Sequence, residues 1–190
     1  MSTVYLAGDM LKKGSILLRE QEAKELRELG HTIYSPIEAK SINDKANQSK
    51  ESNDGLAEKI VRNDTRGILT SDIIVIEPHE NALGTMVELG QIKGYKDCAK
   101  ELHNLLLDAM KVPSDDMKYT LVEGIQALIK QYDKKVYPHL EDIRRTNIPE
   151  CADRRSWSIN QYVYGVCLDV SEGKGFYEWE EILTELGGNK

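Results

Sequence analysis

The sequence has few of the features that mark membrane, metal-binding or nucleic-acid-binding proteins. It contains no apolar run that approaches the ~20 residues of a membrane span, and its amino terminus lacks the pattern of a signal peptide. Its 25 Lys and Arg residues are outnumbered by 32 Asp and Glu residues, and no basic cluster offsets the net charge of −7. We therefore expect a cytoplasmic protein that binds neither a membrane nor a nucleic acid polymer.

Cysteine and histidine are also scarce. The three cysteines form no C-x-x-C pair, and the four histidines show no H-x-x-x-H or H-E-x-x-H spacing. We expect free thiols and no metal site.

The composition that remains is that of an ordinary globular protein. The 190 residues, 40% of them hydrophobic, are enough for a single domain over residues 1–190 with a sizeable core. Short β-prone runs alternate with stretches of helical periodicity, at residues 3–7, 15–29, 31–34, 56–69, 72–77, 135–138 and 179–186. The alternation predicts an α/β fold: a doubly wound (Rossmann-like) parallel sheet of about four to five strands flanked by helices.

Two further segments interrupt this pattern. Apolar stripes on both sides of Pro113 predict a helical hairpin over residues 100–133, inserted before the last strand. The polar stretch at residues 41–54 has almost nothing to bury and predicts a mobile loop, which could act as a lid.

Ligands of a doubly wound sheet bind beyond the carboxyl ends of the strands. Three segments should converge there: Gly8-Asp9, the turn at Pro36, and residues 78–88. Gly8 follows a strand, but GDMLKKG matches neither G-x-G-x-x-G nor a phosphate-binding loop, so Gly8 could serve only as a tight turn. Asp9 could bind substrate or cap the turn that follows it.

Glu88 lies in the sequence LGTMVELG, directly after the most apolar predicted strand. We expect it in the first turn of a helix, where the helix dipole and free N–H groups would keep the carboxylate ionised and able to act as a nucleophile. Tyr5, on a neighbouring strand, could direct its hydroxyl at the same carboxylate. A purely structural alternative is a capping box, in which Thr85 caps the helix and Glu88 folds back onto the Thr85 N–H.

Together these segments resemble the nucleoside 2-deoxyribosyltransferase family. The resemblance covers residues 3–94 well and residues 135–162 more weakly. It rests on Tyr5-Leu6-Ala7-Gly8, on Asn63-Asp64 followed by Ser71-Asp72 and an apolar strand, and on Gly84-Thr85-x-x-Glu88-Leu89-Gly90.

The resemblance implies an enzyme that transfers 2-deoxyribose between nucleobases, with retention at C1′ and without a metal or organic cofactor. Glu88 would attack C1′ and form a covalent deoxyribosyl intermediate, Tyr5 would orient Glu88, and Asp64 would manage the proton of the base. Asp64 could instead be a solvated charge on a helix face. The partners would be deoxynucleosides and free nucleobases, and the residues expected to bind them are Gly8, Asp9, Gly84, Thr85 and Asn160.

Asn160 resembles an asparagine with which family members reach into the site of a neighbouring subunit, which implies a homo-oligomer with active sites near its interfaces. An asparagine before an apolar helical run is also a plain N-cap candidate.

Leu83 departs from the family, which commonly has an acidic residue there. Asp9, Glu77 or Glu80 could substitute for it, or the substrate preference could differ.

Two other functions fit the same residues. The first is a hydrolase that cleaves the N-glycosidic bond of deoxynucleosides or their 5′-monophosphates, with water in place of the acceptor base. For a phosphate, Lys12 and Lys13 are the nearest candidates, but they are typical of a solvated loop, so the sequence favours nucleosides. The second is a binding protein that holds a nucleoside or nucleotide without turnover.

Overall fold

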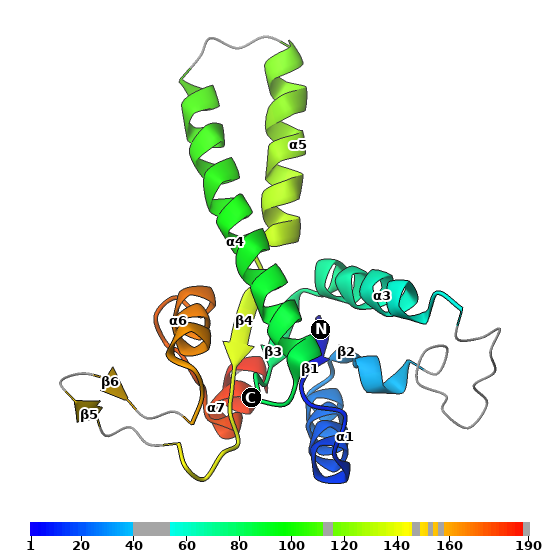
Figure 1. Cartoon of the computed structure of the whole chain (residues 1–190). Coiled ribbons are helices and arrows are strands. Elements are labelled where there is room, and N and C mark those ends of the chain that lie inside the picture. Colours follow the sequence, from blue (N-terminus) through cyan, green and yellow to red (C-terminus); the bar gives the residue numbers. More distant parts are fainter. Residues whose placement is uncertain (40–53, 112–115, 146–148, 152–153, 156–157, 188–190) are drawn as a thin grey trace.

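The computed structural model describes residues 1–39, 54–111, 116–145, 149–151, 154–155 and 158–187 (Figure 1). The loop predicted at residues 41–54 lies almost entirely outside this range. The elements in chain order are β1 (Thr3–Ala7), α1 (Lys13–Glu28), β2 (Thr32–Tyr34), the 3₁₀ helix η1 (Pro36–Glu38), α3 (Leu56–Thr70), β3 (Ile73–Ile76), α4 (Leu83–Met110), α5 (Asp116–Tyr132), β4 (Lys135–Pro138), β5 (Pro149–Cys151), β6 (Arg154–Arg155), α6 (Gln161–Val170) and α7 (Trp179–Gly187).

Four parallel strands form the central sheet, in the order β2-β1-β3-β4. From β1 the chain first moves outward to β2 and then returns to the other side of β1 to form β3. The switch point of the topology therefore lies between β1 and β3, and such a point is where doubly wound sheets bind ligands. The predicted α/β sheet is confirmed. A small antiparallel pair, β5 with β6, was not expected from the sequence.

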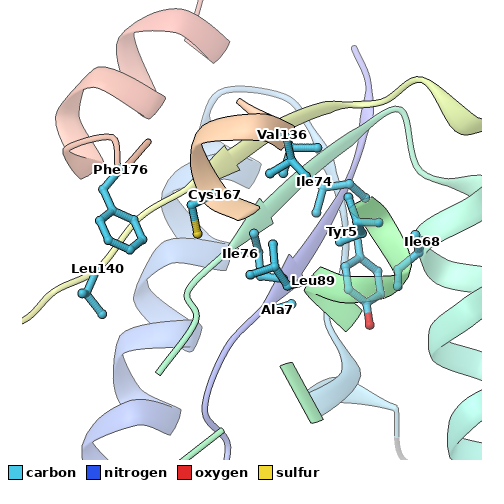
Figure 2. Packing of buried hydrophobic residues seen from close by; sticks show 12 residues of the cluster. Tyr5, Ala7, Ile68, Ile74, Ile76, Leu89, Val136, Leu140, Cys167 and Phe176 are labelled. Carbon is cyan, nitrogen blue, oxygen red and sulfur yellow. The ribbon is translucent and has the colours of Figure 1, made fainter. Parts of the chain in front are cut away.

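Helices cover both faces of the sheet because side chains along each strand alternate between the faces. On one face, Tyr5, Ile74 and Val136 pack with residues of α3, α4 and α6 (Figure 2). On the other face, Val4 and Leu6 pack with residues of α1 and α7. The helices that carry the candidate residues Asp64 and Glu88 therefore share one face with Tyr5.

The first helix of the hairpin starts earlier in the chain than residue 100, where it was predicted to begin. The helix α4 is continuous from Leu83 to Met110, so the first arm of the hairpin is the far half of the helix that carries Glu88. No proline interrupts this stretch, and its glycines are tolerated within the helix. With α5 it projects away from the sheet (Figure 1), and Leu105, Leu107 and Met110 are exposed on it.

No helix in the described part of the chain is both long and apolar enough to cross a bilayer.

Candidate active site

A pocket of about 260 Å³ opens at the carboxyl end of β1, at the switch point of the sheet. The three segments predicted to converge there all contribute to it: the turn after β1, Pro36 after β2, and the start of α4. The helix α3 supplies a fourth wall. The lining residues are Ala7, Gly8, Asp9, Met10, Leu11, Pro36, Ile60, Asp64, Asn81, Ala82, Leu83, Gly84, Thr85 and Glu88.

Tyr5 holds the side chain of Glu88, which lines this pocket. The Tyr5 hydroxyl donates a hydrogen bond of 2.6 Å to Glu88 Oε1. Tyr5 itself is fully buried in the middle of β1, so its ring is a fixed support. A short O–H···O⁻ contact of this length is typical of a charge-assisted hydrogen bond.

The capping-box alternative is wrong. The helix α4 begins at Leu83, after Ala82, and no side chain caps it. Thr85 therefore lies inside the first turn, and Glu88 lies in the second turn rather than the first. The sequence placed the helix start too late because Thr85 is a strong cap residue and Ala82 is not.

This position also changes the electrostatics of Glu88. Burial raises its pKa, the hydrogen bond from Tyr5 lowers it, and the charge of Asp64 raises it, with a balance at about 7. The expected effect of the helix dipole, a carboxylate held firmly ionised, is therefore not found. Burial and the neighbouring charge of Glu88 raise the pKa of Tyr5 well above its ordinary value, so Tyr5 stays a hydrogen-bond donor.

Asp64 lines the pocket from the middle of α3. It is partly buried, and this burial raises its pKa to about 6. Asp64 is therefore not a freely solvated charge on a helix face. Two carboxyl groups with raised pKa values in one pocket can hold and release a proton near neutral pH.

Gly8 makes a close approach to a buried side chain. A Cβ atom at this position would lie 2.5 Å from Nη1 of Arg19. The Arg19 guanidinium is 1% exposed, and its Nη2 is 2.8 Å from both Glu22 Oε1 and Glu77 Oε2. Because these contacts hold the guanidinium in place, the turn after β1 can pass over it only with glycine.

Asp9 organises the same turn. Its Oδ1 accepts a hydrogen bond of 3.0 Å from the Leu11 N–H, and its Oδ2 accepts one of 2.7 Å from the Ser15 hydroxyl. Burial alone would raise the pKa of Asp9, but these two hydrogen bonds, together with the nearby His79 and Lys12, lower the pKa below its usual value. Asp9 thus caps the turn, and it also lines the pocket.

The start of α4 gives the pocket an open, apolar side. A Cβ atom at Gly84 would meet nothing within 4 Å, while Thr85 is buried. Leu83 is 75% exposed at the pocket edge. Of the residues considered as acidic substitutes for it, Glu77 is committed to Arg19, and Glu80 is not among the described lining residues.

Asn160 caps α6, as its alternative interpretation expected. Its side-chain oxygen accepts a hydrogen bond of 2.8 Å from the Tyr162 N–H. It is not among the described residues that line the pocket. One chain therefore brings together every predicted site residue except Asn160.

Two residues of this region were missed in the sequence. Tyr34 stacks on Tyr5 with ring centroids 5.4 Å apart. A Cβ atom at Gly67 would lie 2.6 Å from the Tyr34 ring and 2.8 Å from the Tyr5 ring. A glycine inside a helical pattern is a signal of close backbone approach, and it could have drawn attention to this helix.

Among the residues that the structure describes, no three His, Cys, Asp or Glu side chains gather into a group that could hold a metal ion.

Comparison with known proteins agrees with this geometry. Residues 4–100 match the family model of nucleoside 2-deoxyribosyltransferase. The chain belongs to this family. The match contains the pocket residues Asp64 and Glu88, and Tyr5, which supports Glu88 from β1.

Solved structures resemble the chain at low sequence identity. A conserved protein from Enterococcus faecalis V583 is 18% identical, with a TM-score of 0.57, and the match covers 98% of this chain and 97% of that one. A 2-deoxyribosyltransferase from Bacillus psychrosaccharolyticus is 16% identical, with a TM-score of 0.49, over 96% of this chain and 90% of that one. At this identity the Enterococcus structure supports the fold. No curated protein matches the sequence significantly.

Proposed function

We propose that this family member exchanges nucleobases on 2′-deoxynucleosides by double displacement, with Glu88 as the nucleophile. The observation that carries the proposal is the 2.6 Å hydrogen bond from Tyr5 to Glu88 Oε1, in a pocket that Asp64 also lines. Since Tyr5 engages Oε1, Oε2 is the oxygen that attacks. The proposal assigns Tyr5, Asp64 and Glu88 to the catalytic site, and Gly8, Asp9, Gly84 and Thr85 to the binding of substrate.

The first step forms a bond between a Glu88 oxygen and C1′ of the sugar. The N-glycosidic bond breaks at the same time, and its electron pair moves onto the departing base. Asp64, protonated at the start, gives its proton to a ring nitrogen of that base. The product is an uncharged base and a deoxyribosyl ester of Glu88.

The second step reverses the first with a new base. A ring nitrogen of the acceptor attacks C1′, the ester bond breaks, and its electron pair returns to the Glu88 carboxylate. Asp64 takes up the proton that the acceptor loses. Each step inverts C1′, so the product keeps the configuration of the substrate, by the logic of retaining glycosidases. All charges and protons balance on the chain and its substrates, so no cofactor is required.

The charge of the pocket favours nucleosides over their 5′-monophosphates. Asp9, Asp64 and Glu88 are all acidic, and no lysine, arginine or histidine is among the described residues of the lining. A phosphate would be repelled by the ionised carboxylates and would find no cationic partner on these walls. The neutral deoxynucleoside and the free nucleobase are therefore the substrates that we propose.

The direct test is chromatography of the products formed from thymidine or deoxyinosine, with and without an excess of adenine or cytosine. A new deoxynucleoside that appears only with the acceptor supports transfer. Release of base at the same rate without an acceptor indicates a hydrolase instead, and no product from nucleosides or 5′-monophosphates indicates a binding protein. In parallel, mass spectrometry of acid-quenched protein should find a deoxyribosyl adduct on Glu88 when a donor is supplied alone.

We also propose that the sites are shared between subunits of a homo-oligomer, with Asn160 of one chain contacting the sugar in the next. Asn160 is exposed and lies outside the described pocket lining of its own chain, so a contact with the sugar would have to be made in the pocket of another subunit. Asn160→Ser keeps an oxygen that can cap α6 but shortens the reach. Mixing inactive Asn160→Ser with inactive Glu88→Ala should restore activity, because some mixed sites contain both native residues. Activity that stays absent after refolding the mixture argues against shared sites.

The hairpin of α4 and α5 is best explained as an insertion over residues 100–133 within one deoxyribosyltransferase-like domain. The family match ends at residue 100, within α4, and the hairpin of α4 and α5 projects away from the sheet (Figure 1).

A further inference from the structure

The Tyr34 ring lies against the ring that orients Glu88. The parallel strands β1 and β2 pair Tyr5 with Tyr34 directly, Cα to Cα, so their side chains emerge on the same face. The two rings are stacked with an interplanar angle of 15°. Offset stacking of this kind resists rotation of either ring out of the shared plane.

The other end of Tyr34 contacts the helix that carries Asp64. The Tyr34 hydroxyl donates a hydrogen bond of 3.0 Å to the carbonyl oxygen of Asn63, the residue before Asp64. A single side chain thus touches both halves of the proposed catalytic pair: the ring that supports Glu88 and the turn that carries Asp64.

Gly67 of α3 packs against both tyrosine rings. Because its missing Cβ would lie within 2.8 Å of both tyrosine rings, the rings rest directly on the backbone of the helix. Any larger residue would push the stack away from α3. The two tyrosine rings, packed against the Gly67 backbone, therefore set the distance between α3 and β1.

We propose that Tyr34 is a positioning residue of the active site, which fixes the spacing between Glu88 and Asp64 by bracing the Tyr5 ring and the Asn63–Asp64 turn together. This inference rests on the proposed function. Tyr34 is not among the described residues of the pocket lining, so it acts through Tyr5 and Asp64 rather than by contact with the substrate.

The charges around the stack determine how the proposal can be tested. The ionisable groups that act on Glu88 are Tyr5 and Asp64. Burial first, then Asp64 and Glu88, raise the pKa of Tyr34, while Arg66 lowers it, so Tyr34 remains a neutral donor. Because the hydrogen bond from Tyr5 lowers the pKa of Glu88, loosening the Tyr5 ring should raise that pKa. Because burial raises the pKa of Asp64, loosening its turn should lower that pKa.

The experiment compares Tyr34→Phe, Tyr34→Leu and, as a control on the exposed hairpin, Tyr119→Leu. The first readout is ¹³C NMR titration of Glu and Asp carboxyls without substrate, assigned with Glu88→Gln and Asp64→Asn. The second is kcat and KM for deoxyribosyl transfer over the same pH range. Tyr34→Leu should raise the Glu88 pKa by about half a unit or more and lower kcat about tenfold with little change in KM. Tyr34→Phe keeps the ring, so the Glu88 pKa should stay at its wild-type value. It lacks the hydroxyl that contacts Asn63, so the Asp64 pKa should still fall.

Wild-type pKa values for both carboxyls in Tyr34→Leu would overturn the proposal, as would a kcat loss that merely follows a loss of folded protein. If Tyr34→Leu does not fold, Gly67→Ala displaces the same stack without removing an aromatic ring and must raise the Glu88 pKa in the same direction. An unchanged Asp64 titration in Tyr34→Phe also contradicts the proposal. The titration needs no turnover, so a wild-type protein without transferase activity would refute the proposed function while these shifts still decide the role of Tyr34.

Discussion

Asp64 and Glu88 line one pocket from two different helices, and the charge of Asp64 adds to the burial that raises the pKa of Glu88 to about 7. The pKa of Asp64, raised by burial, is about 6. Two interacting carboxyls with such close values titrate as a pair, so one proton is held between them over a narrow range of pH. Because the pKa of Glu88 is the higher of the two, this proton resides mainly on Glu88. The proposed reaction proceeds from the less populated form, with the proton on Asp64 and a free charge on Glu88.

We predict a bell-shaped dependence of kcat/KM on pH, with a maximum at about pH 6.5. Below about pH 6 both carboxyls are protonated and the nucleophile is lost. Above about pH 7 both are ionised and the departing base has no proton donor. Asp64→Asn should abolish the alkaline fall and leave the acid limb in place, because Asp64 is already protonated and uncharged at the pH of that limb. A persistent alkaline fall in this variant would assign the proton donor elsewhere.

Glu88→Gln should lower kcat at least about 10³-fold, since an amide cannot attack C1′. Its carbonyl oxygen can still accept the hydrogen bond from Tyr5, and no charge is buried, so the free energy of unfolding should change by less than about 1 kcal/mol. Glu80→Gln is the matched control, because Glu80 is exposed just before α4 and outside the described pocket lining. Steady-state kinetics and urea unfolding of both variants are the measurements. Transfer that survives in Glu88→Gln would refute the proposed mechanism.

The sequence was most informative where a single pattern decides the outcome. The apolar run before Pro78 predicted the buried strand β3. A common pocket was predicted because Gly8 follows one strand and Glu88 follows another. The register that sets Tyr34 beside Tyr5 could not be predicted, because it depends on how β1 and β2 pair in space. The pKa of Glu88 could not be predicted either, since it depends on burial and on a helix start three residues earlier than the apparent capping box.

Hydrophobic periodicity also failed to predict which residues of α1 face the core. Arg19 and Glu22 occupy buried positions on this helix, where hydrophobic residues are the rule. They are tolerated because the guanidinium contacts the carboxyl groups of Glu22 and of Glu77, at the end of β3. The pairing of the buried Arg19 charge with Glu77 could not be predicted, because it depends on how α1 packs against the end of β3.

Gly8→Ala should destabilise the fold by about 1–3 kcal/mol, because the new Cβ meets a guanidinium that cannot move aside. Gly14→Ala is the control: it lies in α1 with open space around its Cβ, so alanine should leave stability unchanged or raise it by up to about 1 kcal/mol. Thermal unfolding of both proteins gives the comparison. Equal stability of the two variants would show that the Arg19 side chain is free to shift.

Gly84→Ala is expected to affect binding without affecting the fold. Its Cβ would meet no protein atom within 4 Å, and alanine is the better helix former. The added methyl group would instead occupy space in the pocket where we place the substrate. We predict a KM for the deoxynucleoside raised several-fold at unchanged thermal stability, and an unaltered KM would place the substrate away from the start of α4.

Glu22→Gln should stabilise the protein more at alkaline than at acidic pH. Burial raises the pKa of Glu22 to about 8, Arg19 lowers it, and Glu77, Glu141 and Glu25 raise it. From its ordinary pKa of 4.5 up to about 8, the folded state therefore keeps a proton on Glu22 that the unfolded state releases. Over this range the unfolded state binds fewer protons, so the contribution of Glu22 to the free energy of unfolding falls as pH rises.

Glutamine keeps an acceptor for Arg19 and carries no titratable proton, so this decline should vanish in the variant. The measurement is the difference in Tm between Glu22→Gln and wild type at about pH 5 and about pH 8, which should grow with pH. Glu20→Gln, at an exposed position of the same helix, controls for the general loss of one negative charge and should show no such growth. A difference in Tm that is equal at both pH values would mean that Glu22 is already ionised in the folded protein, and that Arg19 compensates two carboxylates at once.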